Sequence, residues 1–160
     1  MIELDLNSAI NILSLDEYSK MTIEEREKMI DEEDFNREDL FEYIKDRYIG
    51  IKLSYIEEKV KNLYQLSINV NGNPKELYIC SCCNYKTIRE RGNYEICRVC
   101  FWEDDGGNDE SKYSHVNHMT LKEAKDNFKT KGAILENFLK FVDTEGGLKY
   151  YKNDTLTELR

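Results

Sequence analysis

Five cysteines between positions 80 and 100 constrain this chain of 160 residues more than any other feature of its sequence. Four of them form two C-x2-C pairs, Cys80 with Cys83 and Cys97 with Cys100. Such a pair turns two thiolates toward one centre, and four sulfur ligands in a tetrahedron are the usual environment of a structural zinc ion. The spacing therefore predicts that this stretch holds one Zn²⁺ per chain.

Cys82 lies inside the first pair, and five cysteines cannot all bind one tetrahedral ion. We assign the other four as ligands because this choice gives two matching units. Cys82 is then a spare thiol or a substitute ligand. The sequence shows no resolving partner for it outside the cluster, so a redox role has no support.

A disulfide pair or simply buried thiols would be the alternative to a metal site. Residues 1–15 contain Glu3, Asp5 and several polar residues, without a basic stretch that leads into an apolar one. We therefore expect no export signal and a cytoplasmic location. Clustered cysteines in a reducing compartment usually bind metal, which favours zinc.

Three segments around and after the cysteines form a specific pattern. They are C-S-C-C-N-Y-K-T from Cys80, G-N-Y-E-I-C-R-V-C-F-W-E-D-D from Gly92, and N-H-M-T-L-K-E-A-K-D-N-F from Asn117, followed by Gly132. Over about residues 78–132 the chain resembles the bacterial cysteine-rich CPCC family, small proteins of largely unassigned function. The resemblance supports the metal site but implies no reaction.

The chain differs from that family at three positions in its cysteine pairs. Ser81 and Arg98 stand where the family has prolines, and Asn84 stands where it has a glycine. Asparagine tolerates the left-handed conformation needed after such a turn, so we expect that change to be mild. The missing prolines should leave zinc binding intact and make the turns less rigid.

Capping boxes at Thr22–Glu25, Asn36–Asp39 and Thr120–Glu123 mark the starts of three helices. With apolar residues at helical spacing, they predict helices over residues 22–30, 36–48, 52–66, 120–131 and 133–142. In the predicted helix 52–66 a core-facing stripe of apolar residues runs from Tyr55 to Tyr64. The acidic run 31–34 is expected in a loop between helices.

Alternating residues also predict two hairpins. One has strands over 66–70 and 76–79 around a turn at 71–74, and leads into the first cysteine pair. The other lies between the pairs, with strands over 85–88 and 94–96.

These elements predict an α+β fold, in which an N-terminal helical bundle packs on a small zinc-ribbon β-hairpin module with C-terminal helices. We expect an acidic helical region over 1–66, a hairpin plus the CPCC-like zinc-ribbon module over 67–132, and a C-terminal helix and tail over 133–160. No Ser- or Pro-rich linker separates these parts, so we expect them to pack as one unit.

Composition and charge limit the function. The chain is 40% hydrophobic, enough for a core, and no apolar run approaches the length of a membrane span. Residues 1–66 carry 17 acidic and 9 basic residues, net −8, so the other 94 residues carry −1 of the total of −9. The acidic charge is therefore concentrated in the predicted helical region.

An enzyme would need a site outside the four thiolates, because a zinc ion that they saturate has no open position for water. No nucleophile motif, phosphate-binding glycine loop or H-E-x-x-H pattern is present. A second metal or acid–base site would have to use the loop from Glu103 to His118. The residues that could surround the zinc or form such a site are Trp102, Glu103, Asp104, Asp105, His115, Asn117 and His118. We expect Trp102 to shield the zinc and the acidic triplet to cap amides or balance cations.

Nucleic-acid binding is the second alternative. The basic and aromatic residues of the predicted zinc module are Lys86, Arg89, Arg91 and Arg98, with Tyr85 and Tyr94. Binding to phosphates needs a basic surface, and this module is near neutral before its thiolates are counted. A nucleic-acid partner is therefore the weaker expectation.

A protein partner fits an acidic chain better. Acidic surfaces steer association toward basic proteins and can mimic the phosphates that a nuclease binds. We expect a non-catalytic zinc-binding protein that acts through protein–protein interaction, as an immunity or inhibitor protein of a bacterial or phage conflict system, with a basic toxin or nuclease as its partner. The expected contacts are Asp31, Glu32, Glu33, Asp34, Glu38, Asp39 and Glu42.

Overall fold

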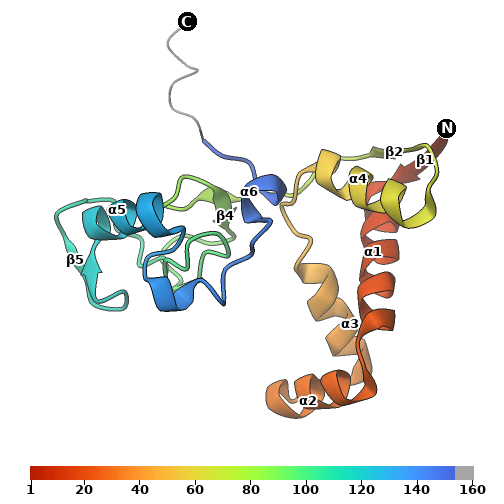
Figure 1. The fold of residues 1–160 in the computed structure, drawn as a ribbon, viewed down its shortest axis with the longest axis horizontal. Coiled ribbons are helices and arrows are strands. Elements are labelled where there is room, and N and C mark those ends of the chain that lie inside the picture. Colours follow the sequence, from red (N-terminus) through yellow and green to blue (C-terminus); the bar gives the residue numbers. More distant parts are fainter. Residues whose placement is uncertain (154–160) are drawn as a thin grey trace, which may run out of the picture. The chain divides into compact units, whose positions relative to one another are not determined.

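The computed structural model describes residues 1–153 and divides the chain into two units, Met1–Lys75 and a second that begins at Glu76 (Figure 1). The first consists mainly of helices, and the second holds small β-sheets, the cysteine cluster and further helices, so the predicted α+β class is confirmed. Within residues 1–153, no helix is both long enough and apolar enough to cross a membrane. The predicted polar tail lies partly outside the described residues.

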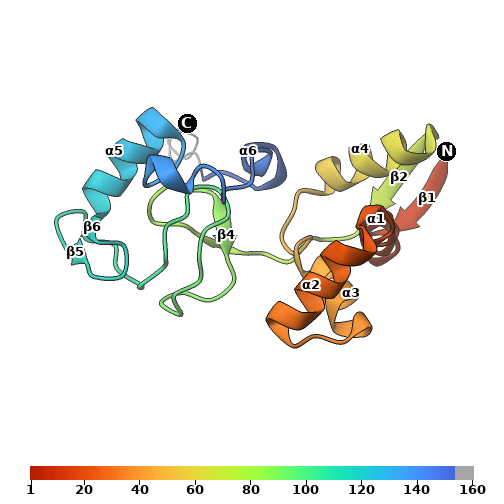
Figure 2. The same ribbon diagram turned by 60° about the horizontal axis from the view of Figure 1, so that its bottom comes forward.

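The first unit contains four helices and a two-stranded sheet. Its elements are β1 (Ile2–Asp5), α1 (Leu6–Lys20), α2 (Ile23–Glu33), α3 (Arg37–Asp46), α4 (Leu53–Tyr64) and β2 (Ile68–Asn71). The capping boxes at Thr22 and Asn36 are both formed. Figure 2 shows α1 beside α3 and near α4.

The sheet of this unit joins the two ends of its sequence. β1 and β2 are parallel, with Ile2 opposite Ile68 and Asp5 opposite Asn71. The alternating strand at residues 66–70 was expected to return as a hairpin over 76–79, and this prediction is wrong because β2 pairs with β1 instead. Ile68 and Val70 are buried on the inner face of the sheet, where each stabilises the fold by about 1.5–3 kcal/mol.

The helix α4 supplies much of the core, as its apolar stripe predicts. Tyr55, Ile56 and Val60 are buried, whereas Tyr64, the last residue of the predicted stripe, is half exposed. Gln65 ends the helix in the left-handed conformation, which changes the direction of the chain one residue after Tyr64.

The acidic run at residues 31–34 is helical, which corrects the prediction of a loop. α2 continues through Glu33, and Asp34 caps it with a φ of 53°. None of the residues of α2 is buried, so this helix contributes little to the core.

The second unit is built from short elements. They are β3 (Tyr78–Ile79), β4 (Lys86–Ile88), β5 (Tyr113–Ser114), β6 (Met119–Thr120), α5 (Leu121–Lys131), the 3₁₀ helix η1 (Glu136–Phe138) and α6 (Gly146–Lys149). α5 begins with the predicted capping box at Thr120, and Gly132 ends it with a φ of 88°.

The helix predicted over residues 133–142 is wrong, and only η1 and turns form there. The reason is that backbone groups of this segment and of the residue that follows it bond to the cysteine turns. Ile134 N donates to Cys100 O over 2.9 Å, and Asp143 N donates to Arg98 O over 2.8 Å. The segment therefore lies along the second cysteine pair.

Candidate metal centre

Each C-x2-C pair forms the tip of its own hairpin. Around the first pair, β3 and β4 are antiparallel, and Cys80 N donates to Tyr85 O over 2.8 Å. Around the second, Cys97 N donates to Trp102 O over 2.8 Å, and Ile96 bridges to Glu103. We call these two turns the first knuckle (residues 80–84) and the second knuckle (residues 97–101).

This pairing corrects the hairpin predicted between the two cysteine pairs. Residues 85–88 pair with residues before the first knuckle, and residues 94–96 pair with residues after the second. The knuckles are themselves the turns of the two hairpins.

The two knuckles have the same backbone geometry. Asn84 N donates to Cys80 O over 3.0 Å, and Phe101 N donates to Cys97 O over 2.8 Å. Asn84 has a φ of 64° and Phe101 a φ of 69°, both in the left-handed region. Asn84 therefore takes the conformation that was expected of it.

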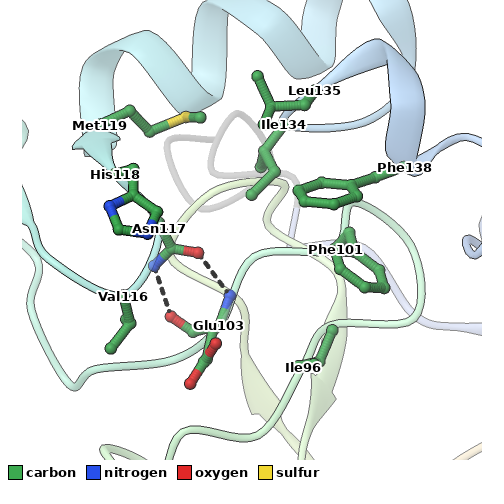
Figure 3. Close-up of a pocket in the computed structure, with 10 residues that line it drawn as sticks. All are labelled: Ile96, Phe101, Glu103, Val116, Asn117, His118, Met119, Ile134, Leu135 and Phe138. Carbon is green, nitrogen blue, oxygen red and sulfur yellow. Dashed lines mark hydrogen bonds between the residues drawn. The ribbon is translucent and has the colours of Figure 1, made fainter.

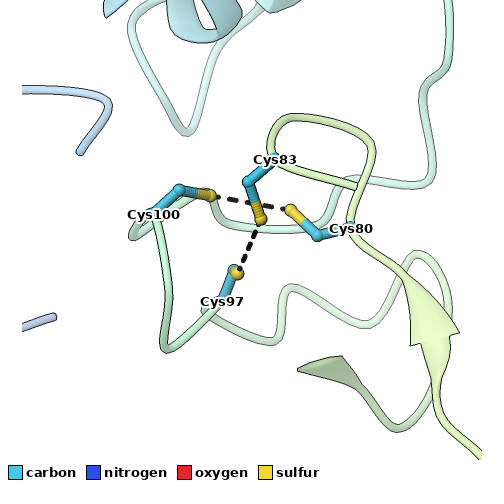
Figure 4. Close-up of side chains that lie close together, drawn as sticks. All are labelled: Cys80, Cys83, Cys97 and Cys100. Carbon is cyan, nitrogen blue, oxygen red and sulfur yellow. Dashed lines mark hydrogen bonds between the residues drawn. The ribbon is translucent and has the colours of Figure 1, made fainter. Parts of the chain in front are cut away.

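The hairpin tips bring four cysteines into one buried cluster (Figure 4). Cys80 Sγ lies 3.6 Å from Cys100 Sγ, Cys83 Sγ lies 3.6 Å from Cys97 Sγ, and all four sulfurs lie within 4.8 Å of one another. In a tetrahedral zinc site with Zn–S bonds of ~2.3 Å, the sulfurs are ~3.8 Å apart. The four cysteines thus fit a single metal ion.

Polar groups around Cys97 favour its thiolate. Thr87 Oγ1 donates to Cys97 Sγ over 3.0 Å, and Val99 N lies 3.4 Å from the same sulfur. Burial raises the pKa of the Cys97 thiol, but hydrogen bonds from Cys100, Cys80, Cys83 and Thr87 outweigh burial and hold the pKa well below its ordinary value. Such outer hydrogen bonds are typical of metal-binding cysteines.

Cys82 is buried, but its sulfur is not among the four that gather in the cluster. Burial raises the pKa of the Cys100 thiol well above its ordinary value, and hydrogen bonds with Cys80 and Cys82 raise it further. Cys82 therefore lies beside the cluster, as a fifth thiol in contact with it.

The three acidic residues after the second knuckle have different surroundings. Asp104 is wholly buried, and its Oδ2 accepts from Gly92 N over 2.7 Å and from Arg91 Nε over 3.1 Å. Asp105 Oδ1 accepts from Gly107 N over 3.0 Å. The carboxylate of Glu103 has no hydrogen bond or ion pair with any described residue. Trp102 is buried in the core behind the second knuckle.

The polar residues of the loop that follows have separate surroundings. His115 packs its ring edge-on against Tyr113, with centroids 5.4 Å apart. Asn117 Oδ1 accepts from Glu103 N over 2.9 Å, and its Nδ2 donates to Glu103 O over 2.9 Å. Figure 3 shows the Glu103 carboxylate and the His118 imidazole on opposite sides of this amide, with no bond between them.

Glu103, Asn117 and His118 nevertheless line one pocket of about 170 Å³. The sequence suggested these three polar residues but not the apolar side chains that form the rest of the pocket. Those residues are Ile96, Phe101, Val116, Met119, Ile134, Leu135 and Phe138. The last three come from the segment that had been expected to be helical, so its attachment to the knuckle creates this wall.

The four basic residues of the predicted nucleic-acid patch bond to groups of the protein itself. Lys86 pairs with Glu76 over 2.9 Å, Arg89 with Glu95 over 3.0 Å, and Arg91 with Asp104 over 3.1 Å. Arg98 hydrogen-bonds the side chain of Tyr150. These cations, which the sequence suggested for a basic and aromatic patch, therefore already have partners within the protein.

The seven acidic residues proposed as partner contacts are all exposed, at the end of α2 and in α3. Three have internal roles: Glu32 pairs with Lys28, Glu42 pairs with Lys45, and Asp39 caps the backbone of Asn36. The carboxylates of the other four have no hydrogen bond or ion pair with any described residue; they are Asp31, Glu33, Asp34 and Glu38.

Comparison with known proteins agrees with this geometry. No curated protein and no solved structure matches the chain. The model of one family, described as Cysteine-rich CPCC, matches residues 78–146, which include both knuckles and the segment bound to the second one. The match ends at Gly146, where a Cβ atom would lie 2.9 Å from Val99 Cγ2 in the second knuckle, so a larger residue would require the Val99 side chain to shift. Residues 78–146 of this chain are thus similar to the cysteine-rich CPCC family.

Proposed function

We propose that this protein is a non-catalytic, cytoplasmic zinc protein that acts by binding another protein through its acidic helices. Two features support this proposal, and they lie in different units of the chain. The first is the cysteine cluster, and the second is the position of the acidic residues on α2.

The four clustered cysteines would hold one zinc ion and leave it no open position. Zinc is the metal that four cysteines in two C-x2-C pairs most often bind. When bound, the ion supplies a cross-link between the two knuckles, and it supplies no activated water. No hydrogen bond joins Glu103 to His118, both of which the structure describes, so this pair gives no support to acid–base chemistry beside the cluster.

The acidic end of α2 is the observation that carries the protein-binding proposal. Asp31, Glu32 and Glu33 lie in the last turn of the helix, which has no basic residue. Negative charge at this end opposes the helix dipole and weakens the helix. Because α2 also buries none of its residues, these charges add nothing to the core, and a role outside the chain explains them better.

The partner that this surface fits is a basic protein. A row of exposed carboxylates resembles the spacing of phosphates and can occupy the nucleic-acid site of a nuclease or another basic toxin. The function that we propose is therefore that of an immunity or inhibitor protein.

Affinity capture of the tagged, zinc-loaded chain from its native cells tests the proposal. We expect one stoichiometric basic protein that is released by moderate salt, together with one zinc per chain in the same preparation. The triple variant Asp31→Lys, Glu32→Lys, Glu33→Lys should weaken this complex about tenfold or more and flatten its salt dependence.

A matched triple variant controls for net charge. Glu58→Lys, Asp126→Lys and Glu136→Lys changes the charge by the same amount, at exposed residues without a side-chain partner among those described. This control should bind the partner as the native chain does. Equal loss in both triple variants would show that net charge, and not the end of α2, determines binding, and would refute the proposal.

A further inference from the structure

We infer that the pocket beside the second knuckle is a binding site for one apolar side chain of a partner protein, next to a lysine or arginine in the partner. We call it the side-chain pocket. The inference goes beyond the proposed function because it places a contact in the second unit, independent of the acidic residues of α2.

The size of the pocket suits a single side chain. Its volume of about 170 Å³ is below the ~300–1,000 Å³ of most small-molecule sites. Figure 3 shows Phe101, Ile134 and Phe138 along one side and Met119 near its upper end. Phe101 and Phe138 lie with ring centroids 4.4 Å apart, so the aromatic wall is already packed. A preformed apolar pocket of this size is typical of the point where a partner inserts an anchor residue.

Two apolar side chains at the rim of the pocket are partly exposed to solvent. Ile96 is 43% exposed and Val116 is 39% exposed. Phe141, which is 58% exposed, stacks on Phe101 with ring centroids 5.5 Å apart and continues the patch outward. A contiguous exposed apolar patch around a pocket marks an interaction surface.

The backbone of the pocket is held in a costly conformation at two places. Phe101 has a φ of 69° and His118 a φ of 55°, and both line the pocket. The left-handed region costs a residue with a Cβ about 1–2 kcal/mol, and the bulky ring of Phe101 makes it an unusual choice. Asn84 shows that the equivalent position of the first knuckle accepts a residue suited to this conformation. The placement of the Phe101 ring in the pocket accounts for the difference.

The charge at the pocket indicates which kind of residue in the partner lies beside the apolar side chain. Glu103 is the acidic residue among those that line it, and its carboxylate has no hydrogen bond or ion pair with any described residue. A cation of the partner would pair with this group. An aromatic or large aliphatic residue beside a lysine or arginine meets both requirements.

Selection from a phage-displayed library of random peptides on the full, zinc-loaded chain tests this inference. We expect the enriched peptides to share an aromatic or large aliphatic residue with a lysine or arginine within a few positions. The selected peptide, labelled with a fluorophore, then gives dissociation constants by anisotropy.

Variants at the exposed rim distinguish peptide binding in the pocket from peptide binding elsewhere on the surface. Val116→Arg brings bulk and positive charge to the rim and should weaken the peptide about tenfold or more. Glu103→Gln should weaken it about threefold, because it removes one exposed ion pair. The controls are Leu148→Arg, at an exposed apolar residue outside the pocket, and Asp126→Asn, at an exposed acid on α5; neither should change binding.

Zinc content and circular dichroism of each variant confirm that it folds. The triple variant of Asp31, Glu32 and Glu33 should bind the selected peptide normally, which separates this inference from the proposed function. No enriched motif, a motif of acidic peptides, or binding that Val116→Arg leaves unchanged would each overturn it.

Discussion

Arg91 Nε donates to Asp104 Oδ2 over 3.1 Å, and Asp104 is wholly buried. The same guanidinium reaches Ser81 Oγ over 3.1 Å and Asn108 Oδ1 over 3.0 Å, so it connects the first knuckle with the segment after the second. A residue that the sequence suggested for a nucleic-acid patch therefore bonds the two hairpins of the cysteine cluster to each other.

Asp104→Asn should destabilise the second unit by about 2 kcal/mol. The variant keeps the volume of the side chain but leaves Arg91 without its counter-charge and weakens the bond to Gly92 N. Urea denaturation of the zinc-loaded protein measures the change. Asp105→Asn is the control and should cost less than about 1 kcal/mol, because that side chain makes one backbone hydrogen bond. Equal costs for the two variants would contradict a special role for the buried carboxylate.

Serine substitutions should affect metal binding at the four clustered cysteines but not at the fifth, Cys82. Replacement of Cys80, Cys83, Cys97 or Cys100 by serine should abolish stoichiometric metal binding, because a thiolate ligand is lost. Cys82→Ser should retain one metal per chain, since its sulfur lies outside the cluster. Metal analysis of purified protein and the thiolate absorption of the Co²⁺ form provide the readouts. Loss of metal in Cys82→Ser would show that this residue is a ligand.

Thr87→Val should lower the affinity for zinc about tenfold. The substitution conserves shape and removes the hydroxyl that donates to Cys97 Sγ over 3.0 Å. Competition with a chromophoric chelator measures the affinity. Thr144→Val, at an exposed threonine, should leave it unchanged. An unchanged affinity in Thr87→Val would mean that this hydrogen bond does not favour the thiolate.

Glu57 should make the stability of the first unit depend on pH. Hydrogen bonds from Lys61 Nζ and Val70 N hold the pKa of this carboxyl below its ordinary value of 4.5. A lowered pKa in the folded state adds stability above the unfolded pKa, and this stability is lost as the pH falls through the folded pKa. Glu57→Gln should therefore cost about 1 kcal/mol at neutral pH, and the difference from the native chain should shrink in acid.

Denaturation curves of Glu57→Gln at neutral and acidic pH test this dependence. Glu58→Gln is the matched control, because Glu58 is exposed and has no side-chain partner among the described residues. If the difference in the free energy of unfolding between the native chain and Glu57→Gln did not depend on pH, the ionised carboxylate of Glu57 would not be the source of the stability.

The charges at the end of α2 should oppose stability while they support binding. The triple lysine variant of Asp31, Glu32 and Glu33 should unfold at a slightly higher temperature than the native chain, because it places positive charge at the helix C-terminus. The loss of the Glu32–Lys28 pair, 3.7 Å long and exposed, offsets this only slightly. Thermal denaturation at low salt measures the effect, and a marked fall in melting temperature would assign these residues a structural role.

Local patterns in the sequence predicted the cysteine cluster and three helix starts. The two C-x2-C pairs and the capping boxes at Thr22, Asn36 and Thr120 depend on residues a few positions apart, so they are visible without the fold. α1 was not predicted because its apolar residues occur all around the helix, and Leu15 remains exposed.

Contacts between distant segments explain the elements that were missed or assigned wrongly. The partner of β2 lies at the start of the chain, and the strand pattern of residues 66–70 carries no information about it. The segment 133–142 has a helical pattern, but its Ile134 N bonds to Cys100 O, and the N of the next residue, Asp143, bonds to Arg98 O. The apolar part of the side-chain pocket depends on that attachment, so the sequence showed only its polar residues.

Phe101 belongs both to the second knuckle and to the wall of the side-chain pocket. Its position is therefore determined by the same turn that places Cys97 and Cys100 in the cluster. On the proposal that the cluster binds zinc, a cell starved of zinc, or one in which oxidants consume thiolates, would lose the turn that positions Phe101 together with the metal site. Under the proposed function, the supply of zinc would then limit how many copies of the protein can bind a partner, even where the chain itself is abundant.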